Sequence, residues 1–402
     1  MMLSDQEHIA LVETYGAHNY HPLPIVVAKG EGVWVTSADG KRYMDMLAAY
    51  SAVNFGHSHK ELVAAAKAQL DRVTLTSRAF HNDQLGLFAK ELVALCGMEM
   101  MLPMNTGAEG VETAIKTARK WGYKVKKVPE GKAKIIVCAG NFHGRTTTIV
   151  SFSTDPQARA DFGPFTPGFE IVPYGDAKAL EKAIDKHTVA FLVEPIQGEA
   201  GIVVPPKGYL QEVRRICTAK NILMIADEIQ SGLGRTGTTF ACEHEDVVPD
   251  MYVLGKALGG GIMPLSAVVS RKDVLGVFAP GDHGSTFGGN PLATAVGRKA
   301  VELLAKGDLQ KHAREVGGYL FDKLGAAKWS RVKEIRGRGL WVGLELKMEA
   351  GPARPYCEKL MHEGLLCKET HEQVIRLAPP LVITREEVDW AFARLDKVLG
   401  GA

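Results

Sequence analysis

Short apolar runs alternate along this chain with longer segments in which apolar residues recur at helical spacing. Runs of strand length occur at Lys134–Cys138, Glu170–Val172, Ala190–Val193, Ile222–Ala226 and Met251–Leu254. Helical patterns lie between or before them, at Glu61–Leu70, Asp83–Leu95, Glu112–Trp121 and Leu210–Lys220. Strands buried on both faces of a sheet are continuously apolar, and the helices between them cover those faces. The alternation therefore predicts an α/β fold built on a mostly parallel sheet.

The pattern changes after Pro291, which is followed by a long helical stretch to about Leu324. Val332–Ile335 and Leu340–Leu346 then look like strands of a smaller, mixed domain. Thr384–Glu387 has the sequence of a capping box and opens a last amphipathic helix. We expect a smaller domain of helices and strands after the larger sheet domain.

The segment Asp250–Gly261 joins the last of the apolar runs to a lysine. The run ends at Gly255, and Lys256 follows it, ahead of small residues and three consecutive glycines. A lysine at the end of a buried strand is poorly solvated, which favours its neutral amine, and a neutral amine forms a Schiff base with an aldehyde. Pyridoxal phosphate is a cofactor bound in this way. On this segment alone, a surface lysine in a glycine-rich loop explains the residues equally well.

A second candidate follows the preceding run, because Asn221–Ala226 closes directly on Asp227 and Glu228. Open α/β sheets bind their ligands at the carboxyl ends of the strands. A carboxylate there that faces the pyridine nitrogen of pyridoxal phosphate would keep this nitrogen protonated. The alternative is an aspartate that only turns the chain into the next loop. Matched groups on successive strand ends favour the cofactor site.

A candidate phosphate site lies at Thr106, Gly107 and Ala108, just before the helical pattern that begins near Thr113. Backbone N–H groups at a helix N-terminus bind phosphate without a basic side chain, and glycine lets the phosphate come close. Many helices begin with Thr-Gly, so this signal is weak alone.

Two further motifs suggest other kinds of site. Gly232–Gly237 reads G-L-G-R-T-G and formally matches the dinucleotide fingerprint, which makes a nicotinamide-dependent dehydrogenase an alternative. That fingerprint should open a helix directly after a strand, whereas T-T-F-A-C follows it here. His57-Ser58-His59 could suggest a metal, but no second ligand pair has suitable spacing, and we predict no metal site.

Composition limits the class of protein without naming a function. Charged residues make up 23% and apolar residues 46% of the 402 residues, and the formal net charge is +2. These values are typical of a globular protein and give no electrostatic reason to expect nucleic acid or an anionic membrane as a partner. The six cysteines lack paired spacing, which is typical of reduced thiols. No basic residue precedes Lys29, so no signal or transit peptide is predicted, and we expect a cytoplasmic protein.

Segments spread over nearly the whole chain resemble the class III aminotransferases, which act on ω-amino acids, and more narrowly the ornithine aminotransferases within that family. The matching segments are Gly16–Pro24, Ala49–Asn54, Asn105–Glu109, Phe142–Thr146, Glu194–Gly201, Ala226–Gly237, Leu254–Gly261, His283–Pro291, Arg336–Trp341 and Arg376–Leu381. Each is unspecific alone, but as an ordered set they are highly specific.

The resemblance implies the aspartate-aminotransferase fold, known as fold type I, with pyridoxal 5'-phosphate as cofactor. It implies an N-terminal segment, 1–49, that contributes to the small domain and the substrate pocket. A large cofactor-binding domain, 50–292, and a small C-terminal domain, 293–402, would follow. The resemblance also implies a homodimer, or a higher homo-oligomer, with shared active sites. Ser285 and Thr286 would reach the cofactor phosphate from the other subunit.

The roles of the cofactor-site residues also follow from this resemblance. Lys256 would hold the cofactor and then move a proton as general base and acid. Asp227 would contact the ring nitrogen. Phe142 and Ile229 would pack on the two ring faces, and Gln230 would approach the 3'-oxygen.

The implied reaction transfers the δ-amino group of L-ornithine to 2-oxoglutarate, giving glutamate 5-semialdehyde and glutamate. One pocket then needs carboxylate anchors at two depths, and arginine suits both because its planar fork binds carboxylates bidentately. By resemblance, Arg145 with Tyr20 would hold the α-carboxylate of ornithine, and Arg376 that of glutamate or 2-oxoglutarate. Glu199 would neutralise Arg376 when ornithine is bound. The alternative for each arginine is a structural ion pair.

Substrate choice within the family rests on the N-terminal segment with Tyr20 and on Tyr50. Acetylornithine and 4-aminobutyrate aminotransferases share the other motifs and remain alternatives, as does a catalytically silent or racemase-like pyridoxal protein. Two departures from the family pattern stand out: Phe55, where glutamine is common, and Thr36-Ser37-Ala38 before Asp39. Neither falls on a residue assigned to the chemistry, so they put only details of the pocket in doubt.

Overall fold

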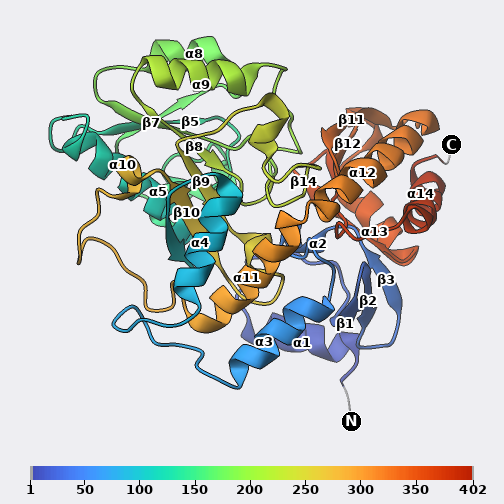
Figure 1. Ribbon diagram of the computed structural model, residues 1–402. Coiled ribbons are helices and arrows are strands. Elements are labelled where there is room, and N and C mark those ends of the chain that lie inside the picture. Colours follow the sequence, from blue (N-terminus) through green and yellow to red (C-terminus); the bar gives the residue numbers. More distant parts are fainter. Residues whose placement is uncertain (1–2, 401–402) are drawn as a thin grey trace.

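A seven-stranded sheet forms the centre of the molecule in the computed structural model, which describes residues 3–400 (Figure 1). The strand order is β4-β10-β9-β8-β7-β5-β6. The strands are β4 (Met100–Met104), β5 (Lys134–Cys138), β6 (Phe169–Val172), β7 (Thr188–Val193), β8 (Leu223–Asp227), β9 (Met251–Leu254) and β10 (Ser266–Ser270). The five strands expected from the apolar runs are confirmed to within one or two residues.

The sheet is parallel from β9 through β8, β7 and β5 to β6, which confirms the predicted mostly parallel architecture. At the other edge, β10 pairs antiparallel with both β9 and β4. The sequence pattern does not predict β10, because Ser266–Ser270 is short and flanked by serines. Strand β10 is buried because β9 and β4 pair with it on its two sides.

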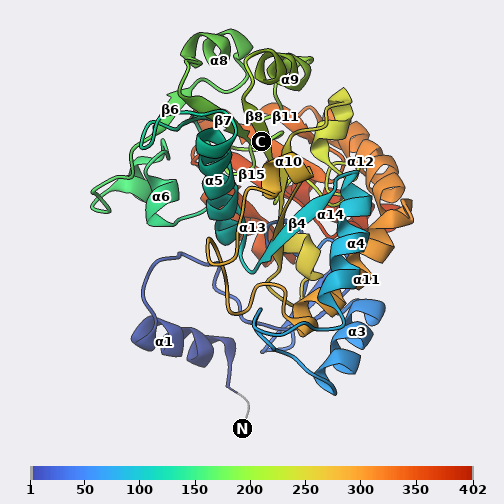
Figure 2. The same cartoon turned by 60° about the vertical axis from the view of Figure 1, so that its left-hand side comes forward.

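Alternate residues of each strand enter two different hydrophobic cores, because successive side chains of a strand point to opposite faces. Ile136 and Phe191 belong to one core, whereas Ile135 and Ala190 belong to the other. One face is covered by α5 (Gly107–Lys124). Helices α3 (Lys60–Leu70), α4 (Leu85–Cys96), α8 (Ala177–Ala183), α9 (Tyr209–Ala219) and α11 (Pro291–Ala305) contribute to the other core. Figure 2 shows α5 on one side of the strands and α4 and α11 on the other.

Two smaller four-stranded sheets lie beside this domain. One combines β1 (Val27–Glu31), β2 (Trp34–Ser37) and β3 (Arg42–Asp45) with β13 (Leu365–Leu366), and β13 runs parallel to β3. The other has the order β11-β12-β15-β14 and comprises β11 (Val332–Arg338), β12 (Trp341–Leu346), β14 (Lys368–Thr370) and β15 (Val374–Leu377). The N-terminal and C-terminal parts of the chain therefore lie side by side (Figure 1). The domain boundaries stay a prediction, and their outermost residues, 1–2 and 401–402, lie outside the described residues.

Helices α12 (Asp308–Ala327), α13 (Arg354–His362) and α14 (Arg385–Leu399) pack on the small sheets. The long helical stretch predicted after Pro291 is confirmed, but it consists of two helices, because α11 ends at Ala305 and α12 starts at Asp308. Gly307 breaks the helix with φ of 77°, a left-handed conformation that glycine adopts without steric cost. The capping box that opens α14 is confirmed, since Thr384 Oγ1 accepts a hydrogen bond from Glu387 N and the Glu387 side chain accepts one from Thr384 N. The remaining short helices are α1 (Asp5–Tyr15), α2 (Ala48–Ser51), α6 (Thr147–Val150), α7 (Pro156–Arg159) and α10 (Lys272–Leu275).

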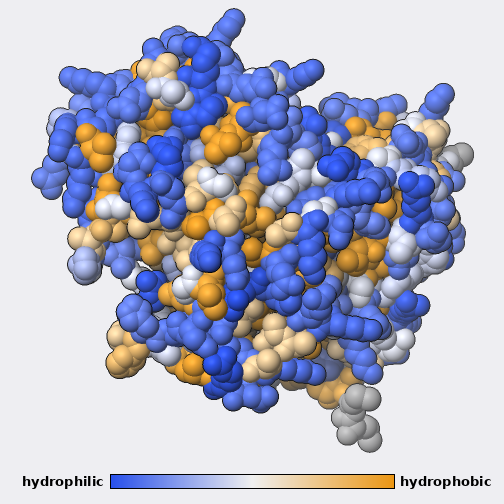
Figure 3. Space-filling view, viewed as in Figure 1, coloured by the Kyte–Doolittle hydropathy of each residue, from blue (hydrophilic) through white to orange (hydrophobic). Residues whose placement is uncertain are grey.

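Polar residues cover most of the face seen in Figure 3, and apolar residues interrupt them across its middle. Several large apolar side chains are exposed in the single chain, among them Leu75, Phe80, Leu87 and Phe287. Within residues 3–400, no helix is both long and apolar enough to cross a membrane.

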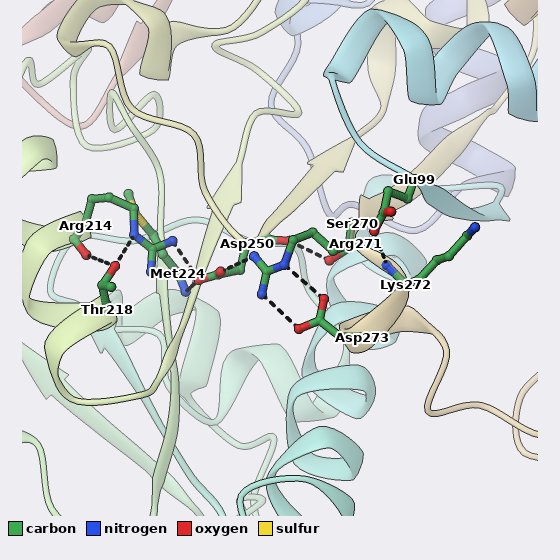
Figure 4. A network of polar contacts seen from close by, with 9 residues as sticks. All are labelled: Glu99, Arg214, Thr218, Met224, Asp250, Ser270, Arg271, Lys272 and Asp273. Carbon is green, nitrogen blue, oxygen red and sulfur yellow. Dashed lines mark hydrogen bonds and ion pairs between the residues drawn. The ribbon is translucent and has the colours of Figure 1, made fainter.

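A buried carboxylate fixes the end of the sheet where β9 begins (Figure 4). Asp250 directly precedes β9, and its Oδ2 accepts hydrogen bonds from Met224 N of β8 and Arg214 of α9, both at 2.7 Å. Its Oδ1 accepts from Arg271, just after β10, at 2.6 Å. Hydrogen bonds to charged groups are the stronger ones, so Asp250 ties three neighbouring strands and one helix together.

We expect Asp250→Ala to lower the free energy of unfolding by about 3–5 kcal/mol, because it leaves two arginines and a buried N–H without their acceptor. Urea denaturation followed by circular dichroism measures the loss. Asp273→Ala is the matched control, since Asp273 also pairs with Arg271 but its side chain is 63% exposed. Exposed pairs contribute about 0–1 kcal/mol. Equal losses in the two variants would contradict a special role for Asp250.

Candidate active site

The carboxyl ends of β8 and β9 meet at one edge of the sheet and carry the two residues singled out from the sequence. Asp227 is the last residue of β8 and pairs with Val253 of β9, while Lys256 follows two residues after β9 ends. Asp227 is buried and Lys256 is half-buried, and both side chains line the same pocket, whose empty volume, open mouth included, is ≈ 550 Å³. The other lining residues are Gly107, Ala108, Phe142, His143, Gly144, Glu194, Ile196, Ile229, Gln230 and Ser231.

The Asp227 carboxylate is held in place on both oxygens. Oδ1 accepts a hydrogen bond from Ile229 N at 3.1 Å, and Oδ2 lies 2.6 Å from Nδ1 of the buried His143. Burial alone would lower the pKa of His143, but the hydrogen bond and negative charge of Asp227 raise it. His143 Nε2 has no hydrogen-bond partner among the described residues.

Glu194 adds a second buried carboxylate next to this pair. Its oxygens accept hydrogen bonds from Phe142 N at 3.0 Å and Gly198 N at 3.3 Å. Burial raises its pKa to about 7, and the positive charge of His143 opposes that rise. Phe142 is thus fixed at the pocket wall through its own backbone.

Lys256 has a backbone conformation that is rare for a residue with a side chain, with φ of 47°. Such conformations cost about 1–3 kcal/mol and cluster at functional sites. Burial lowers the pKa of its amine to about 8, although the nearby Glu199 carboxylate acts in the opposite direction. At neutral pH a larger fraction of this amine is therefore neutral and nucleophilic than in an exposed lysine.

The N-terminus of α5 faces the same pocket. Thr106 is its N-cap, with Oγ1 accepting from Glu109 N while the Glu109 side chain accepts from Thr106 N. Gly107 and Ala108 line the pocket, whereas Thr106 does not. The first N–H groups of a helix have no partner within it, so those of Gly107 and Ala108 can bind an anion. A Cβ added at Gly107 would lie 3.0 Å from the Ile229 side chain, so glycine lets the N-terminus of α5 lie this close to Ile229.

Arg376 lies in β15, at the small-domain side of the site, and is only 1% exposed. Its guanidinium donates to Glu199 Oε1 and Gln230 Oε1, each at 2.8 Å. The rings of Tyr50 and Trp341 lie 5.1 and 5.3 Å from its Cζ. Burial opposes ionisation of Glu199, but the charge of Arg376 keeps the pKa of Glu199 below its usual value.

The structure does not bring all of the predicted residues together. Phe142, Ile229 and Gln230 line the pocket. Arg145 is exposed, and its Cζ lies 5.9 Å from the centre of the Phe142 ring. Tyr20 is 72% exposed and close enough to Tyr50 to influence the pKa of that phenol.

Ser285 and Thr286 do not line the pocket of their own chain. Ser285 Oγ lies 3.0 Å from Nδ2 of Asn105, just ahead of α5, and Thr286 is exposed. Their predicted contribution to the site of a second subunit stays a prediction.

The sequence patterns assign no role to His143, Glu194, Gly198 or Trp341. All four lie within the motif segments, which mark the region but do not single out these residues. The need for glycine at position 198 follows only from the three-dimensional structure, because a Cβ there would lie 2.8 Å from Gln230 Oε1 and 2.9 Å from the Trp341 ring.

The two other motifs have structural roles. Gly232–Gly237 forms turns and opens no helix, so it lacks the geometry of a dinucleotide site. His57 bonds Asp45 across 2.8 Å, and His59 precedes the first residue of α3. Among residues 3–400, no group of three potential metal-ligating side chains could hold an ion.

Comparison with known proteins agrees with this geometry. Residues 15–399 match the family described as Aminotransferase class-III. The chain belongs to this family. The ornithine aminotransferase of Geobacillus sp. (strain WCH70) is 59% identical over the full length of both chains, and that of Bacillus subtilis is 56% identical over 99% of this chain and 98% of its own.

Among solved structures, the ornithine aminotransferase of Toxoplasma gondii has a TM-score of 0.97 at 44% identity, covering 99% of this chain and 94% of that one. The acetylornithine aminotransferase of Elizabethkingia anophelis has a TM-score of 0.90 at 47% identity, covering 98% of this chain and 99% of that one. The fold is therefore the pyridoxal-phosphate aminotransferase fold expected from the sequence.

Class III aminotransferases depend on pyridoxal phosphate, and the pocket residues fit this cofactor. The N–H groups at the start of α5 are available for the phosphate, and the Asp227 carboxylate is available for the pyridine nitrogen. Lys256 supplies the amine that would bind the aldehyde.

We expect the amine of Lys256 to react with pyridoxal phosphate faster as pH rises through about 8, because the neutral amine is the nucleophile. The measurement is borohydride trapping in cofactor-free protein between pH 6 and 10, with the labelled peptide mapped by mass spectrometry. Lys256→Ala is the control and should lose the label. A label on another lysine, or a rate independent of pH, would contradict the assignment.

Proposed function

We propose that this aminotransferase transfers the δ-amino group of L-ornithine to 2-oxoglutarate, giving glutamate 5-semialdehyde and glutamate by a ping-pong mechanism. Glutamate 5-semialdehyde then cyclises to pyrroline-5-carboxylate. The relatives named ornithine aminotransferase, similar over the whole chain, support this choice. The structural observation that carries the alternation between two unlike substrates is the Arg376–Glu199 ion pair beside the Lys256 pocket, whereas the choice of ornithine as donor rests on these relatives.

This ion pair suits an enzyme with two unlike substrates. A dicarboxylate needs a free arginine near the reacting atoms, and the Nε of Arg376 has no hydrogen-bond partner among the described residues. Ornithine presents an amine at that end instead, and an uncompensated buried cation would repel it. Glu199, at 2.8 Å, neutralises Arg376 in that case and releases it when a carboxylate competes.

The exposed Arg145 is proposed to bind the α-carboxylate of ornithine, together with the hydroxyl of Tyr20. Arg145 has no ion pair with a described carboxylate, so its fork is open for a substrate. The two arginines differ in burial, which supports anchors at two depths.

Bound pyridoxal phosphate supplies an electron-accepting ring conjugated to the substrate nitrogen. We assign to Asp227 the task of holding a proton on the ring nitrogen, with His143 and Ile229 N fixing its orientation. Lys256 would hold the cofactor through its amine and would afterwards take up and give back a proton at its own nitrogen. Its pKa of about 8 suits a group that gives and takes a proton near neutral pH. Phe142 and Ile229 would pack on the two faces of the ring, and Gln230 would lie near its 3'-oxygen.

A homodimer with shared sites, or a higher homo-oligomer, completes the proposal. Leu75, Phe80, Leu87 and Phe287 are large apolar side chains exposed in the single chain, which a second copy would cover. Ser285 and Thr286, open at the surface near α5, would then reach the partner's phosphate site. The cytoplasmic location expected from the sequence belongs to the same proposal.

An acetylornithine aminotransferase is the second candidate, because a solved enzyme of that name is 47% identical to this chain. It differs in its amino donor and would use the same Arg376–Glu199 pair.

The function is tested by adding single amino donors to the purified holoenzyme and following its visible absorbance. We expect L-ornithine to convert the yellow form fully, and 2-oxoglutarate to restore it. Acetylornithine and 4-aminobutyrate should react at least about tenfold more slowly, a difference of about 1.4 kcal/mol in the barrier. Faster conversion by either of them would move the protein to that branch, and no conversion by any donor would overturn the proposal.

Tyr20→Phe tests the ornithine anchor, because it removes one hydroxyl donor to a charged carboxylate. We expect ornithine to lose about 1.5–3 kcal/mol in kcat/KM and glutamate to lose less, since its α-carboxylate lies on Arg376. Single-turnover rates give both values. A simple diamine, which has no carboxylate, is the substrate control, and its single-turnover rate should hardly change in Tyr20→Phe. Equal losses for ornithine and glutamate would make Tyr20 a structural residue.

A further inference from the structure

Four consecutive residues that are not glycine have left-handed backbone conformations next to the site. Ala48, Ala49, Tyr50 and Ser51 have φ of 47°, 46°, 59° and 73°. The ψ values of Ala49 and Tyr50, 48° and 44°, complete a left-handed helical turn. Each such residue costs roughly 1–2 kcal/mol, and left-handed residues ordinarily occur singly. A run of this kind persists only where its surroundings enforce it.

The Asp45 carboxylate is the main restraint on this turn. Its Oδ1 accepts hydrogen bonds from Leu47 N at 2.8 Å and Ala48 N at 2.9 Å. Its Oδ2 lies 2.8 Å from His57 Nε2, which fixes the carboxylate from the other side. Asp45 is itself buried, so these bonds form away from solvent.

The backbone supplies further restraints on both sides of the turn. Val53 N donates to Ala48 O at 3.0 Å and closes the turn. Ala378 N donates to Met46 O at 2.6 Å, which joins the chain before the turn to the segment just after Arg376. The hydrogen bond between Ala378 and Met46 therefore links the turn to the segment that carries Arg376.

What the turn presents to the site is the ring of Tyr50. This ring lies 5.1 Å from Arg376 Cζ, with Trp341 at 5.3 Å as a second ring. Burial raises the pKa of Tyr50 to about 12, so the ring stays a neutral phenol at physiological pH. A ring within about 6 Å of a guanidinium attracts it and limits its orientations.

Ala49 shows that the strain is not explained by packing. Its side chain is exposed, so the methyl group contributes little to any core. Glycine would adopt the same φ without steric cost but would also leave the backbone free to move. An alanine at this position narrows the conformations of the turn and thereby of Tyr50.

We propose that the left-handed turn Ala48–Ser51 is a strained positioning element that Asp45 and His57 hold in place. It fixes Tyr50 over Arg376 and thereby sets the affinity of the site for a dicarboxylate. This effect on affinity rests on the proposed function, in which Arg376 binds glutamate and 2-oxoglutarate. Ala49 and Asp45 are positioning residues that act through Tyr50.

Ala49→Gly is the decisive variant, with Ala52→Gly as its matched control. Ala52 is close in sequence but has φ of −80° and ψ of −28°, an ordinary helical conformation. Ala49→Gly should raise the melting temperature of the holoenzyme by relieving strain, whereas Ala52→Gly should lower it. If the melting temperature of Ala49→Gly equals or falls below that of the parent enzyme, the turn is not strained.

The positioning role has its own readouts. In Ala49→Gly, the Kd for glutarate, an unreactive dicarboxylate, should rise roughly two- to tenfold by calorimetry. The Michaelis constant (KM) for the acceptor 2-oxoglutarate should rise by the same factor, with kcat within about twofold of the parent enzyme. Ala52→Gly should change none of these. A more stable Ala49→Gly variant with unchanged glutarate affinity would overturn the positioning role.

Asp45→Ala and Asp45→Asn complete the test. Asparagine keeps an oxygen that accepts from Leu47 N and Ala48 N, so it should preserve glutarate affinity better than alanine does. Equal effects of the two would contradict the proposed restraint. If no amino donor converts the parent enzyme, the proposed function fails, yet the melting temperatures still decide whether the turn is strained.

Discussion

The parallel pairing of β8 with β9 is the constraint on which the site depends. Neighbouring parallel strands end at the same edge of a sheet, so Asp227 and Lys256 are brought to one pocket by backbone hydrogen bonds alone. Asp250 fixes the opposite end of the same strands through Arg214, Arg271 and Met224 N. The residues proposed for the chemistry are therefore placed by the central sheet.

Burying the site's charges requires partners that come from several parts of the chain. Asp227 faces His143, and Arg376 faces Glu199. Arg235 differs, because it is fully buried and bonds neutral acceptors: the carbonyls of Leu340 and Pro379 and the Asn54 side chain. Burial lowers its pKa to about 9, and the nearby positive charge of Arg376 acts in the same direction. These three acceptors come from segments far apart in sequence, so Arg235 holds together the parts of the chain that surround Arg376.

The sequence predicts those features of the structure that depend on neighbouring residues, and it misses those that depend on contacts between distant segments. Strands such as Lys134–Cys138 and Met251–Leu254 are predicted because burial on both faces makes them continuously apolar. Asp227 and Lys256 are found because they directly follow such strands. The strand Ser266–Ser270 is missed because its burial depends on pairing with β4 and β9. The break at Gly307 is missed because an isolated glycine also occurs inside helices.

Contacts between distant segments explain the remaining surprises at the site. The bond of His143 to Asp227 and the approach of Trp341 to Gly198 join residues far apart in sequence, and neither has a local pattern. The left-handed turn at Ala48–Ser51 is harder still, because alanine and tyrosine favour other conformations and only Asp45 and the fold override them.

The site thus combines a fixed half with a half that can respond to the substrate. Asp227 and Lys256 belong to the sheet edge, and their positions do not depend on which substrate is present. Arg376 is also fixed, but its partner Glu199 is a half-buried side chain whose carboxylate can move away. In the proposed function, Arg145 and Tyr20 would turn toward an arriving carboxylate without breaking an ion pair, because both are exposed and neither has one among the described residues. A site of this kind accepts two unlike molecules in turn because only the side chains at its rim have to change.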